Sequence, residues 1–369
     1  MTVFTPHQEQ ALRATDQWLK ARPGSAGTPQ VFRLFGFAGT GKTTLARHIA
    51  ESVSGEVKFA AFTGKAALVM RHKGCEGAST IHSLIYRARE TLEEQPSFEL
   101  WDEAPASKAS LIVIDECSMV DAELGHDLLS FGVPVLVLGD PAQLPPIQGA
   151  GFFTDAEPDA MLTEVHRQAA DDPIIHLSMA VREGEWIEPG RYGESEVVRK
   201  SALDPERVLG ADQVLVGRNA TRRAYNGRLR ERRGFTQMLP EADDKLVCLR
   251  NNRRKGLFNG GLWKVKERSA PRATGTVGLR LVPDEDIGRT VKVTIRRECF
   301  TGGLDELDWQ LRKRYDEFDY GYVLTVHKAQ GSQWDDVVLF DESFAFPDAR
   351  ARWLYTGITR AARRLTIVM

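Results

Sequence analysis

A glycine-rich string near the N-terminus constrains this chain more than any other feature. Residues 36–44 read GFAGTGKTT and fit G-x-x-x-x-G-K-[ST], the pattern of a phosphate-binding loop. The apolar run 31–35 before it predicts a buried strand, and 45–53 after it has the pattern of a helix. In this context glycines let backbone N–H groups surround phosphate oxygens at the N-terminus of a helix.

The loop predicts binding of ATP with Mg²⁺. We expect Lys42 to reach the β- and γ-phosphates and Thr43 to hold Mg²⁺ through its hydroxyl. A glycine-rich turn before an ordinary helix is the alternative, which the agreement of every fixed position and both flanks disfavours. The expected nucleotide contacts of the loop are Gly36, Gly39, Thr40, Gly41, Lys42, Thr43 and Thr44.

Composition limits the class of protein. The chain has 369 residues, of which 42% are hydrophobic and 27% charged, as expected for a globular protein of about two or three domains. It has no apolar run of membrane-spanning length and no signal-peptide pattern, so we expect no membrane association and a cytoplasmic location. The net charge of −2 gives no global signature of nucleic-acid binding, although basic clusters occur at 218–233, 250–255 and 360–364.

Apolar runs alternate with helical patterns over most of the chain, which predicts an α/β protein with parallel sheets. The alternation stops at 88–108, an acidic and irregular stretch. It stops again at 256–320, where short apolar segments are separated by turns that contain Gly or Pro. We expect a small insertion at the first place and a β-rich insertion within a second α/β core at the second.

Two further strings at predicted strand ends carry the chemistry of phosphoryl transfer. The apolar run 111–114 ends in Asp115, expected to bind Mg²⁺, and Glu116, expected to act as the general base for the attacking water. The string 138–146 contains Gln143, which is placed to hydrogen-bond a γ-phosphate or that water. Two acids after a strand, or a proline-rich turn, occur by chance, but their spacing after a phosphate-binding loop favours the functional interpretation.

Together these strings resemble the motifs of superfamily 1 helicases of the RecD-like and Dda-like group, superfamily 1B, which translocate 5′→3′ on single-stranded DNA. Further strings match in the order in which the family has them: FTPHQ at 4–8, TGKAA at 63–67, TIHSL at 80–84, LTEVHRQ at 162–168, FNGG at 258–261, YVLTVHKAQGS at 322–332 and LYTGITRA at 354–361. Cys117, Ala329 and Gly357 depart from the usual residues, and none of these changes removes a charged catalytic group.

The resemblance implies two RecA-like P-loop NTPase cores with parallel sheets, a small β-hairpin insertion in the first and a small SH3-like β-barrel insertion in the second. The expected boundaries are 1–87 and 109–165 for the first core, 88–108 for the pin-like insertion, 166–255 and 321–369 for the second core, and 256–320 for the β-barrel-like insertion.

The resemblance also implies roles for residues outside the loop. Gln8 is expected to read adenine, Gln330 and Gly331 to contact the nucleotide, and Arg167 and Arg360 to act on the γ-phosphate as arginine fingers. Arg360 belongs to the second core, so ATP binding would close the two cores on each other and move the bound strand.

The expected partners are single-stranded DNA and DNA forks, bound by a monomer. The DNA contacts that the resemblance implies are Thr63, Lys65, Thr80, His82, Pro145, Thr325, His327 and Lys328. Phe98, in the pin-like insertion, is expected to stack on the base pair at the fork. Taken singly, each of these residues also suits a helix cap, a core position or packing of the hairpin.

Two alternatives remain open from the residues alone. An RNA helicase or remodeller on the same cores is one, because the contacts that read a 2′-OH are not visible in the sequence. A P-loop ATPase that acts as a binding module or as a small-molecule kinase is the other. Stimulation of ATP hydrolysis by single-stranded DNA or RNA separates these classes, because a kinase should show none.

Overall fold

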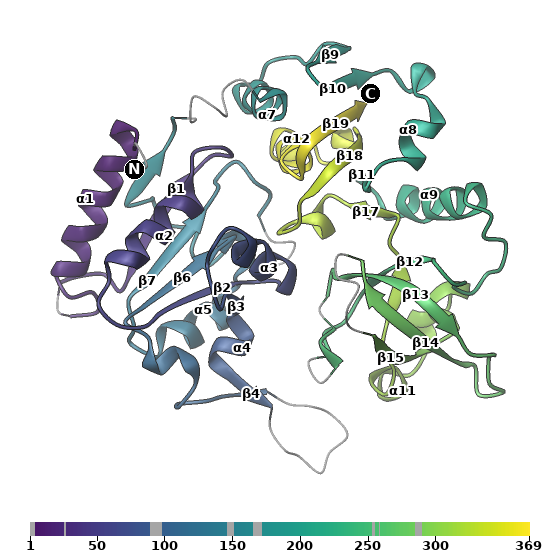
Figure 1. The fold of residues 1–369 in the computed structure, drawn as a ribbon, viewed down its shortest axis with the longest axis horizontal. Coiled ribbons are helices and arrows are strands. Elements are labelled where there is room, and N and C mark those ends of the chain that lie inside the picture. Colours follow the sequence, from purple (N-terminus) through teal and green to yellow (C-terminus); the bar gives the residue numbers. More distant parts are fainter. Residues whose placement is uncertain are drawn as a thin grey trace.

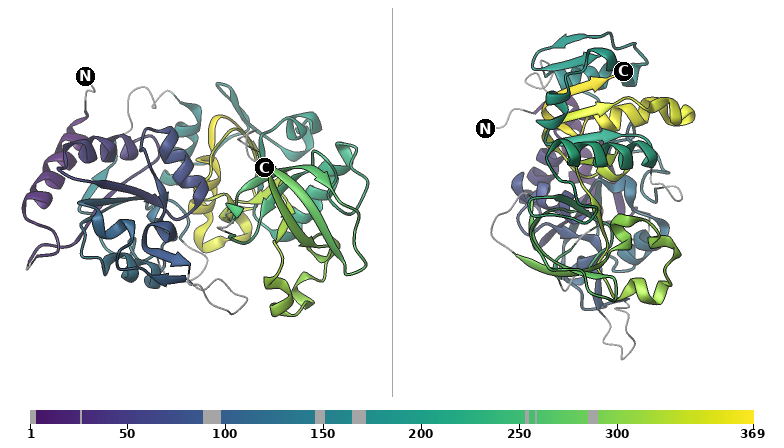
Figure 2. Two further views of the ribbon diagram at one scale, coloured as in Figure 1. Left: turned by 60° about the horizontal axis from the view of Figure 1, so that its bottom comes forward. Right: turned by 90° about the vertical axis from the view of Figure 1, so that its right-hand side faces the viewer.

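The structure is a computed structural model that describes residues 4–25, 27–88, 98–145, 151–164, 172–252, 255–257, 259–284 and 290–369. Two parallel sheets lie beside each other, and a smaller antiparallel unit adjoins the second sheet (Figure 1). The C-terminal segment lies between the N-terminal unit and the antiparallel unit (Figure 2, left). Among the described residues, no helix is both long and apolar enough to cross a membrane.

The first unit is a six-stranded sheet in the order β3-β2-β6-β7-β1-β8, and its neighbouring strands all pair in parallel. Its strands are β1 (Val31–Gly36), β2 (Val57–Ala61), β3 (Ser79–Thr80), β6 (Leu111–Asp115), β7 (Val135–Gly139) and β8 (Ala160–Leu162). Its helices are α1 (Pro6–Lys20), α2 (Lys42–Ser52), α3 (Gly64–His72), α4 (Ile81–Ile85) and α5 (Ala122–Leu129), with short 3₁₀ turns at η1 (Pro105–Lys108) and η2 (Cys117–Met119).

Both faces of this first sheet are covered, which explains why its strands are continuous apolar runs. On β6, Leu111 packs into the core on the side of α2, where it meets Leu45. Its neighbour Ile112 points to the opposite face and packs with Leu124 of α5. Because adjacent side chains on a strand point to opposite faces, a strand covered on both sides needs apolar residues at every position. The prediction of a parallel α/β sheet is confirmed.

A short antiparallel hairpin, β4 (Tyr86–Ala88) and β5 (Phe98–Leu100), projects from the first unit (Figure 1). Its paired strands begin two residues before the expected start of the insertion at 88. The insertion was expected to run to 108, but Ala104 and Ala106 are fully buried and Ala106 belongs to the core of the first unit. The segment after the hairpin therefore packs as part of that core.

The second unit is a six-stranded sheet in the order β17-β11-β18-β19-β10-β9. Only the edge strand β9 pairs antiparallel, with β10. Its strands are β9 (Gly190–Tyr192), β10 (Ser195–Val198), β11 (Gln213–Val216), β17 (Val323–Thr325), β18 (Trp334–Phe340) and β19 (Ala361–Val368). Its helices are α7 (Pro173–Glu183), α8 (Pro205–Leu209), α9 (Asn219–Arg232) and α12 (Arg350–Ile358), with 3₁₀ turns at η3 (Lys200–Ala202), η6 (His327–Ala329), η7 (Ser343–Ala345) and η8 (Pro347–Ala349).

The third unit is a five-stranded antiparallel sheet in the order β15-β14-β13-β12-β16. Its strands are β12 (Lys245–Cys248), β13 (Leu262–Arg268), β14 (Thr276–Pro283), β15 (Val291–Arg296) and β16 (Phe318–Tyr320), joined by α10 (Glu298–Thr301), η5 (Leu304–Glu306) and α11 (Trp309–Lys313). The expected β-rich insertion began at 256, but the sheet starts earlier because β12 is its fourth strand in spatial order.

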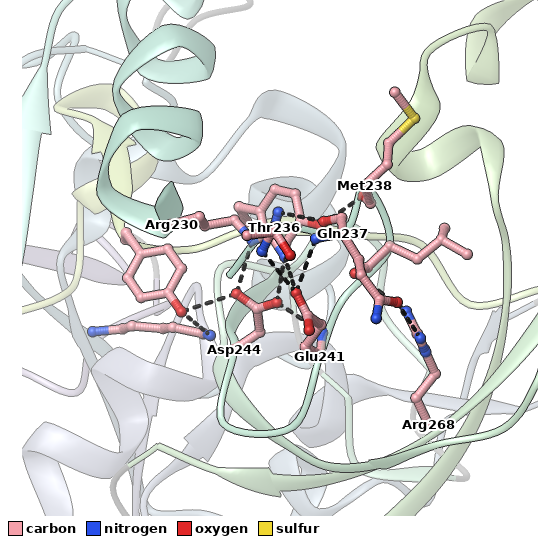
Figure 3. A network of polar contacts seen from close by, with 11 residues as sticks. Arg230, Thr236, Gln237, Met238, Glu241, Asp244 and Arg268 are labelled. Carbon is pink, nitrogen blue, oxygen red and sulfur yellow. Dashed lines mark hydrogen bonds and ion pairs between the residues drawn. The ribbon is translucent and has the colours of Figure 1, made fainter. Parts of the chain in front are cut away.

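A buried ion pair joins the second and third units (Figure 3). Arg230 of α9 donates from Nε to Asp244 Oδ1 at 2.9 Å and from Nη2 to Asp244 Oδ2 at 2.8 Å. Their side chains are only 7% and 0% exposed. Tyr322, which precedes β17, donates its hydroxyl to Asp244 Oδ1 at 3.0 Å and accepts from the backbone N–H of Lys245 at 3.0 Å. The pair therefore fixes α9 against the start of β12 in the antiparallel sheet.

Replacing Arg230 with alanine is expected to lower the free energy of unfolding by about 3–5 kcal/mol, because the Asp244 carboxylate would remain buried without its cation. Urea denaturation of the variant measures this loss. Arg223→Ala is the control, since Arg223 is exposed on the same helix, and its effect should stay within about 0.5 kcal/mol. Equal losses in the two variants would show that the ion pair does not stabilise the joint.

Candidate nucleotide site and nucleic-acid interface

The phosphate-binding loop lies at the carboxyl end of β1 and leads into α2. Gly39 and Gly41 have φ of 77° and 81°, a region that residues with a Cβ seldom adopt. A Cβ at Gly36 would lie 2.7 Å from Thr40 Oγ1 and 2.8 Å from Leu162 Cβ. Positive φ thus favours glycine at positions 39 and 41, and close packing against Thr40 and Leu162 favours it at position 36.

The lysine, threonine and aspartate predicted to bind Mg·ATP lie together at this end of the sheet. Lys42 Nζ donates to the carbonyl oxygens of Gly36 at 2.6 Å and Phe37 at 3.0 Å, so the ammonium folds back over the loop. Thr43 Oγ1 donates to Asp115 Oδ2 at 3.2 Å. One hydroxyl and one carboxylate fit Mg²⁺, which prefers oxygen ligands and fills its remaining positions with water and substrate phosphate. Among the described residues no cluster of three or more His, Cys, Asp or Glu forms a metal site of its own.

Burial and charge act together on Asp115. Burial raises the pKa of its carboxyl, the neighbouring Glu116 raises it further, and Lys73 and Lys42 oppose both effects. A bound cation would favour the ionised form in the same way as these lysines do. A divalent cation beside Asp115 would therefore stabilise its ionised carboxylate against the effects of burial and of Glu116.

Glu116 and Arg360 face each other across the two parallel-sheet units. Glu116 has φ of 54°, a left-handed conformation that is uncommon for a residue with a side chain and is found most often at functional positions. Arg360 Nη1 lies 3.8 Å from Glu116 Oε1, and the arginine is only 4% exposed. Its guanidinium also donates to the carbonyl oxygens of Thr356 at 3.0 Å and Ser332 at 3.2 Å, which orients it toward the first unit.

A cleft of about 500 Å³ opens between these two units at the phosphate-binding loop. From the first unit it is lined by the predicted residues Gly39, Gly41, Lys42, Thr43, Thr44, Asp115, Glu116 and Gln143, and from the second by Gly331 and Arg360. The structure therefore brings together in one cleft side chains that are separated by more than 300 residues in the sequence.

Gln143 lies in the loop after β7 and is 9% exposed. Its Oε1 atom is buried and has no hydrogen-bond partner among the described residues. A buried acceptor without a partner is costly, so its position in the cleft suits a water molecule or a ligand that donates to it. A role of Gln143 toward the γ-phosphate or the attacking water stays a prediction.

Two predicted nucleotide residues are engaged with protein groups. Gln8 accepts from the backbone N–H of Thr5 at 3.1 Å and donates to Thr40 O at 3.0 Å, so it braces the phosphate-binding loop from α1. Gln330 donates to Leu144 O at 2.8 Å and links the second unit to the loop after β7. Adenine reading by Gln8 and nucleotide contact by Gln330 stay predictions.

The DNA contacts predicted in the first unit lie at helix starts and at the boundary with the second unit. Thr63 and Thr80 cap α3 and α4, accepting from the backbone N–H groups of Ala66 at 3.1 Å and Ser83 at 3.2 Å. Lys65 Nζ lies 4.1 Å from the ring centre of Trp334 in β18, a cation–π contact between the two units. The caps serve the local fold, and a role toward DNA stays a prediction for these residues.

His82, at the start of α4, lies among aromatic rings, with its ring centre 6.2 Å from that of Phe62 and 5.6 Å from that of Tyr86. Pro145 is exposed at the end of the loop after β7.

The contacts predicted in the second unit follow β17. Thr325 Oγ1 accepts from the backbone N–H of Lys328 at 3.3 Å and is 9% exposed. The ring of His327 lies 5.1 Å from that of Phe346, and burial lowers its pKa below the usual value for histidine. Burial also lowers the pKa of Lys328, with a further contribution from the positive charge of Arg222. These groups lie at the carboxyl edge of the second parallel sheet.

Two predicted residues are only partly placed or not placed at all. Arg167 and residues 165–171 around it lie outside the described part of the chain. The backbone of Phe98 begins β5 and pairs with Ala88, whereas its side chain is outside the described part.

The sequence patterns gave no role to Tyr355 or Arg182, which both contact the phosphate-binding loop from the second unit. Tyr355 Oη accepts from the backbone N–H of Ala38 at 2.8 Å, and the guanidinium of Arg182 lies 3.8 Å from the ring centre of Phe37. Tyr355 lies within the matched string at 354–361, so the sequence marked its position. The string did not show which group the tyrosine contacts. Arg182 lies on a helix that carries no recognised motif.

The fold and this cleft define a P-loop nucleotide-binding protein whose nucleotide site lies between two RecA-like units. A sequence model of the family described as AAA domain matches residues 13–202, just over half of the chain. A second model, the UvrD-like helicase C-terminal domain, matches residues 320–368.

The ATP-dependent RecD2 DNA helicase of Deinococcus radiodurans is 30% identical over 364 residues, which cover 90% of this chain and 46% of that protein. The ATP-dependent DNA helicase Dda of Enterobacteria phage T4 is 34% identical over 166 residues, covering 41% of this chain and 37% of that protein. The chain therefore spans less than half the length of these two relatives.

Among solved structures, the Pif1 helicase from Bacteroides in complex with ADP-AlF3 and ssDNA superposes with a TM-score of 0.57 at 16% identity, covering 99% of this chain and 92% of that one. At 16% sequence identity, this similarity shows that the two proteins share a fold. The chain belongs to the family described as AAA domain, whose model matches more than half of it, and its sequence is similar to the helicases RecD2 and Dda.

Proposed function

We propose that this chain is an ATP-dependent DNA helicase that moves 5′→3′ on single-stranded DNA and separates duplex. The observation that carries the proposal is the pairing of Arg360 with Glu116 at 3.8 Å across a cleft that also holds the phosphate-binding loop. An arginine from one unit beside the base of the other makes hydrolysis depend on the relative position of the two units. The similarity to RecD2 and Dda, both ATP-dependent DNA helicases, supports the same activity.

The proposed chemistry follows from the side chains in the cleft. Lys42 and the loop N–H groups bind the β- and γ-phosphates of ATP, while Thr43 and Asp115 hold Mg²⁺, which neutralises charge on the phosphate oxygens. Glu116 accepts a proton from the water that attacks the γ-phosphorus, and the bond from that phosphorus to the bridging oxygen of ADP breaks. Gln143 orients the water, and the arginines Arg360 and Arg167 stabilise the charge that develops on the transferred group.

The proposed DNA path follows the carboxyl edges of both parallel sheets. The first unit contributes residues after β2 and β3 and the exposed Pro145, and the second contributes residues after β17. Because Leu144, next to Pro145, is hydrogen-bonded to Gln330 and Thr356 of the second unit, movement of one unit is transmitted to this edge. We also propose that the hairpin β4–β5 serves as a pin and that the antiparallel unit is an SH3-like β-barrel.

Two assays test this proposal. ATP hydrolysis is measured with and without single-stranded DNA or RNA of equal length, and unwinding is measured on duplexes with a 5′ or a 3′ tail. We expect stimulation by DNA and unwinding only from the 5′ tail. Stimulation by RNA alone would favour the RNA-helicase alternative, and hydrolysis that is insensitive to both would favour a kinase or a binding module.

Phe98→Ala is expected to slow strand separation while ATP hydrolysis and translocation on single strands remain normal. Stacking of an aromatic ring on a base contributes about 1–3 kcal/mol, and the alanine variant would no longer hold the fork open. Phe98→Trp, which keeps an aromatic face, should restore unwinding. An equal loss in unwinding, translocation and thermal midpoint for the alanine variant would instead make Phe98 a residue that packs the hairpin.

A further inference from the structure

A tyrosine hydroxyl connects the phosphate-binding loop with the second unit. Tyr355 Oη accepts from the backbone N–H of Ala38 at 2.8 Å and donates to Asp140 Oδ2 at 2.7 Å. Asp140 belongs to the first unit, directly after β7, and its other oxygen accepts from the N–H of Ala142 at 3.0 Å. The hydroxyl therefore bridges two separate segments of the first unit, and both of its hydrogen-bonding roles are used.

This bridge is buried and chemically well defined. Tyr355 is 1% exposed and Asp140 is 6% exposed. Burial raises the pKa of Tyr355, and Asp140 beside it raises that pKa further, so the phenol keeps its proton and remains a donor to the carboxylate. A buried hydroxyl that satisfies one donor and one acceptor cannot be removed without leaving both without a partner.

Arg182, which like Tyr355 belongs to the second unit, contacts the loop at Phe37, next to Ala38. The guanidinium of Arg182, on α7, lies 3.8 Å from the ring centre of Phe37, and its Nη1 atom is buried without a hydrogen-bond partner in the described part of the chain. Phe37 and Ala38 are the first two of the four variable positions that follow the first glycine of the motif. The second unit thus contacts the loop at two positions with no predicted catalytic role, at the ring of Phe37 and at the backbone N–H of Ala38.

The same helix carries the tyrosine and leads to the arginine. Tyr355 lies in the last turn of α12, which ends at Ile358, and Arg360 follows two residues later. Arg360 Nε donates to Thr356 O at 3.0 Å, so the guanidinium is held against the turn that contains Tyr355. A helical turn is rigid, so fixing Tyr355 on the loop fixes the distance from the loop to the guanidinium of Arg360.

We propose that Tyr355 is a positioning residue for ATP hydrolysis, whose hydroxyl holds the loop at Ala38 in register with Arg360, which lies two residues beyond the end of the same helix. This inference rests on the proposed function, since it assigns Tyr355 to the turnover step at that cleft. Nucleotide binding depends on Lys42 and on the loop residues 39–44, whereas the hydroxyl contacts the loop at Ala38. Its loss should therefore affect turnover much more than affinity.

The test is Tyr355→Phe, which keeps the buried ring and removes only the oxygen. We expect kcat for ATP to fall about tenfold, while KM for ATP changes less than about twofold. The matched control is Tyr322→Phe, because Tyr322 also accepts from a backbone N–H and donates to a buried aspartate, but at the joint with the antiparallel sheet. We expect Tyr322→Phe to lower the thermal midpoint about as much as Tyr355→Phe does, and to leave kcat at the wild-type value.

A double-mutant cycle shows whether Tyr355 acts through Arg360. The tyrosine variant should cost little further turnover in an Arg360→Ala background, because the group that it positions is already absent. Equal kcat for wild type and Tyr355→Phe, or an unchanged tenfold loss in the Arg360→Ala background, would overturn the proposal. Both measurements use ATP hydrolysis without DNA, so they test the role of Tyr355 independently of DNA. An absence of DNA stimulation in the wild-type protein would reject the proposed helicase function, but not the role of Tyr355.

Discussion

Arg360→Ala is expected to lower DNA-stimulated ATP hydrolysis by about 10³–10⁵-fold, the range for an arginine that stabilises transferred phosphoryl charge. Binding of single-stranded DNA should remain close to the wild-type value, because Arg360 lies in the nucleotide cleft. Steady-state hydrolysis and fluorescence anisotropy with a labelled oligonucleotide measure the two quantities.

Arg360 also donates to Thr356 and Ser332, so its loss could disturb the fold as well as the chemistry. Arg360→Lys separates the two effects, since lysine keeps the charge but not the planar fork that pairs with phosphate oxygens. We expect this variant to keep its thermal midpoint and to hydrolyse ATP slowly. A variant that lost DNA affinity while retaining hydrolysis would place Arg360 in the nucleic-acid interface.

Glu116→Gln is expected to bind ATP and to hydrolyse it about 10²–10⁴-fold more slowly than wild type, because the amide keeps the shape of the carboxylate but cannot accept the proton. Lys42→Ala should instead weaken nucleotide binding and abolish turnover, since the loop loses its only side-chain cation. Binding of a fluorescent ATP analogue and single-turnover hydrolysis distinguish the two variants. Normal hydrolysis by Glu116→Gln would assign the general base to another group.

Local sequence determined the nucleotide-binding half of the site. The loop 36–44 and the acids Asp115 and Glu116 were predicted because each requirement is met by residues adjacent in the chain: glycines for positive φ, a helix start for the anion, and a strand end for the acids. The parallel α/β architecture was predictable for the same kind of reason, since strands covered on both faces need uninterrupted apolar runs. The family resemblance then supplied the role of Arg360, which local pattern alone does not show.

The limits of the insertions depended on packing, which the sequence pattern did not reveal. Residues 101–108 look irregular and polar, yet Ala104 and Ala106 are fully buried, because small side chains let this segment lie close against the first sheet. Likewise β12 follows a helix of the second unit along the chain, but it pairs with β13 and β16 and so belongs to the antiparallel sheet. Strand pairing is set by contacts between distant segments, so a change in local periodicity locates such a boundary only approximately.

By itself, then, the sequence determined which residues are chemically able to bind and hydrolyse a nucleotide, because glycine, lysine and carboxylate positions act through the backbone next to them. Apart from the role of Arg360, which the family resemblance supplied, only the tertiary structure decided which groups of the second unit meet them. Ala38 and Tyr355 are 317 positions apart, and Leu144 and Gln330 are 186 apart. Hydrogen bonds of 2.8 Å between such positions arise from the packing of α12 and β17 beside the first unit, and no spacing in the chain encodes that distance.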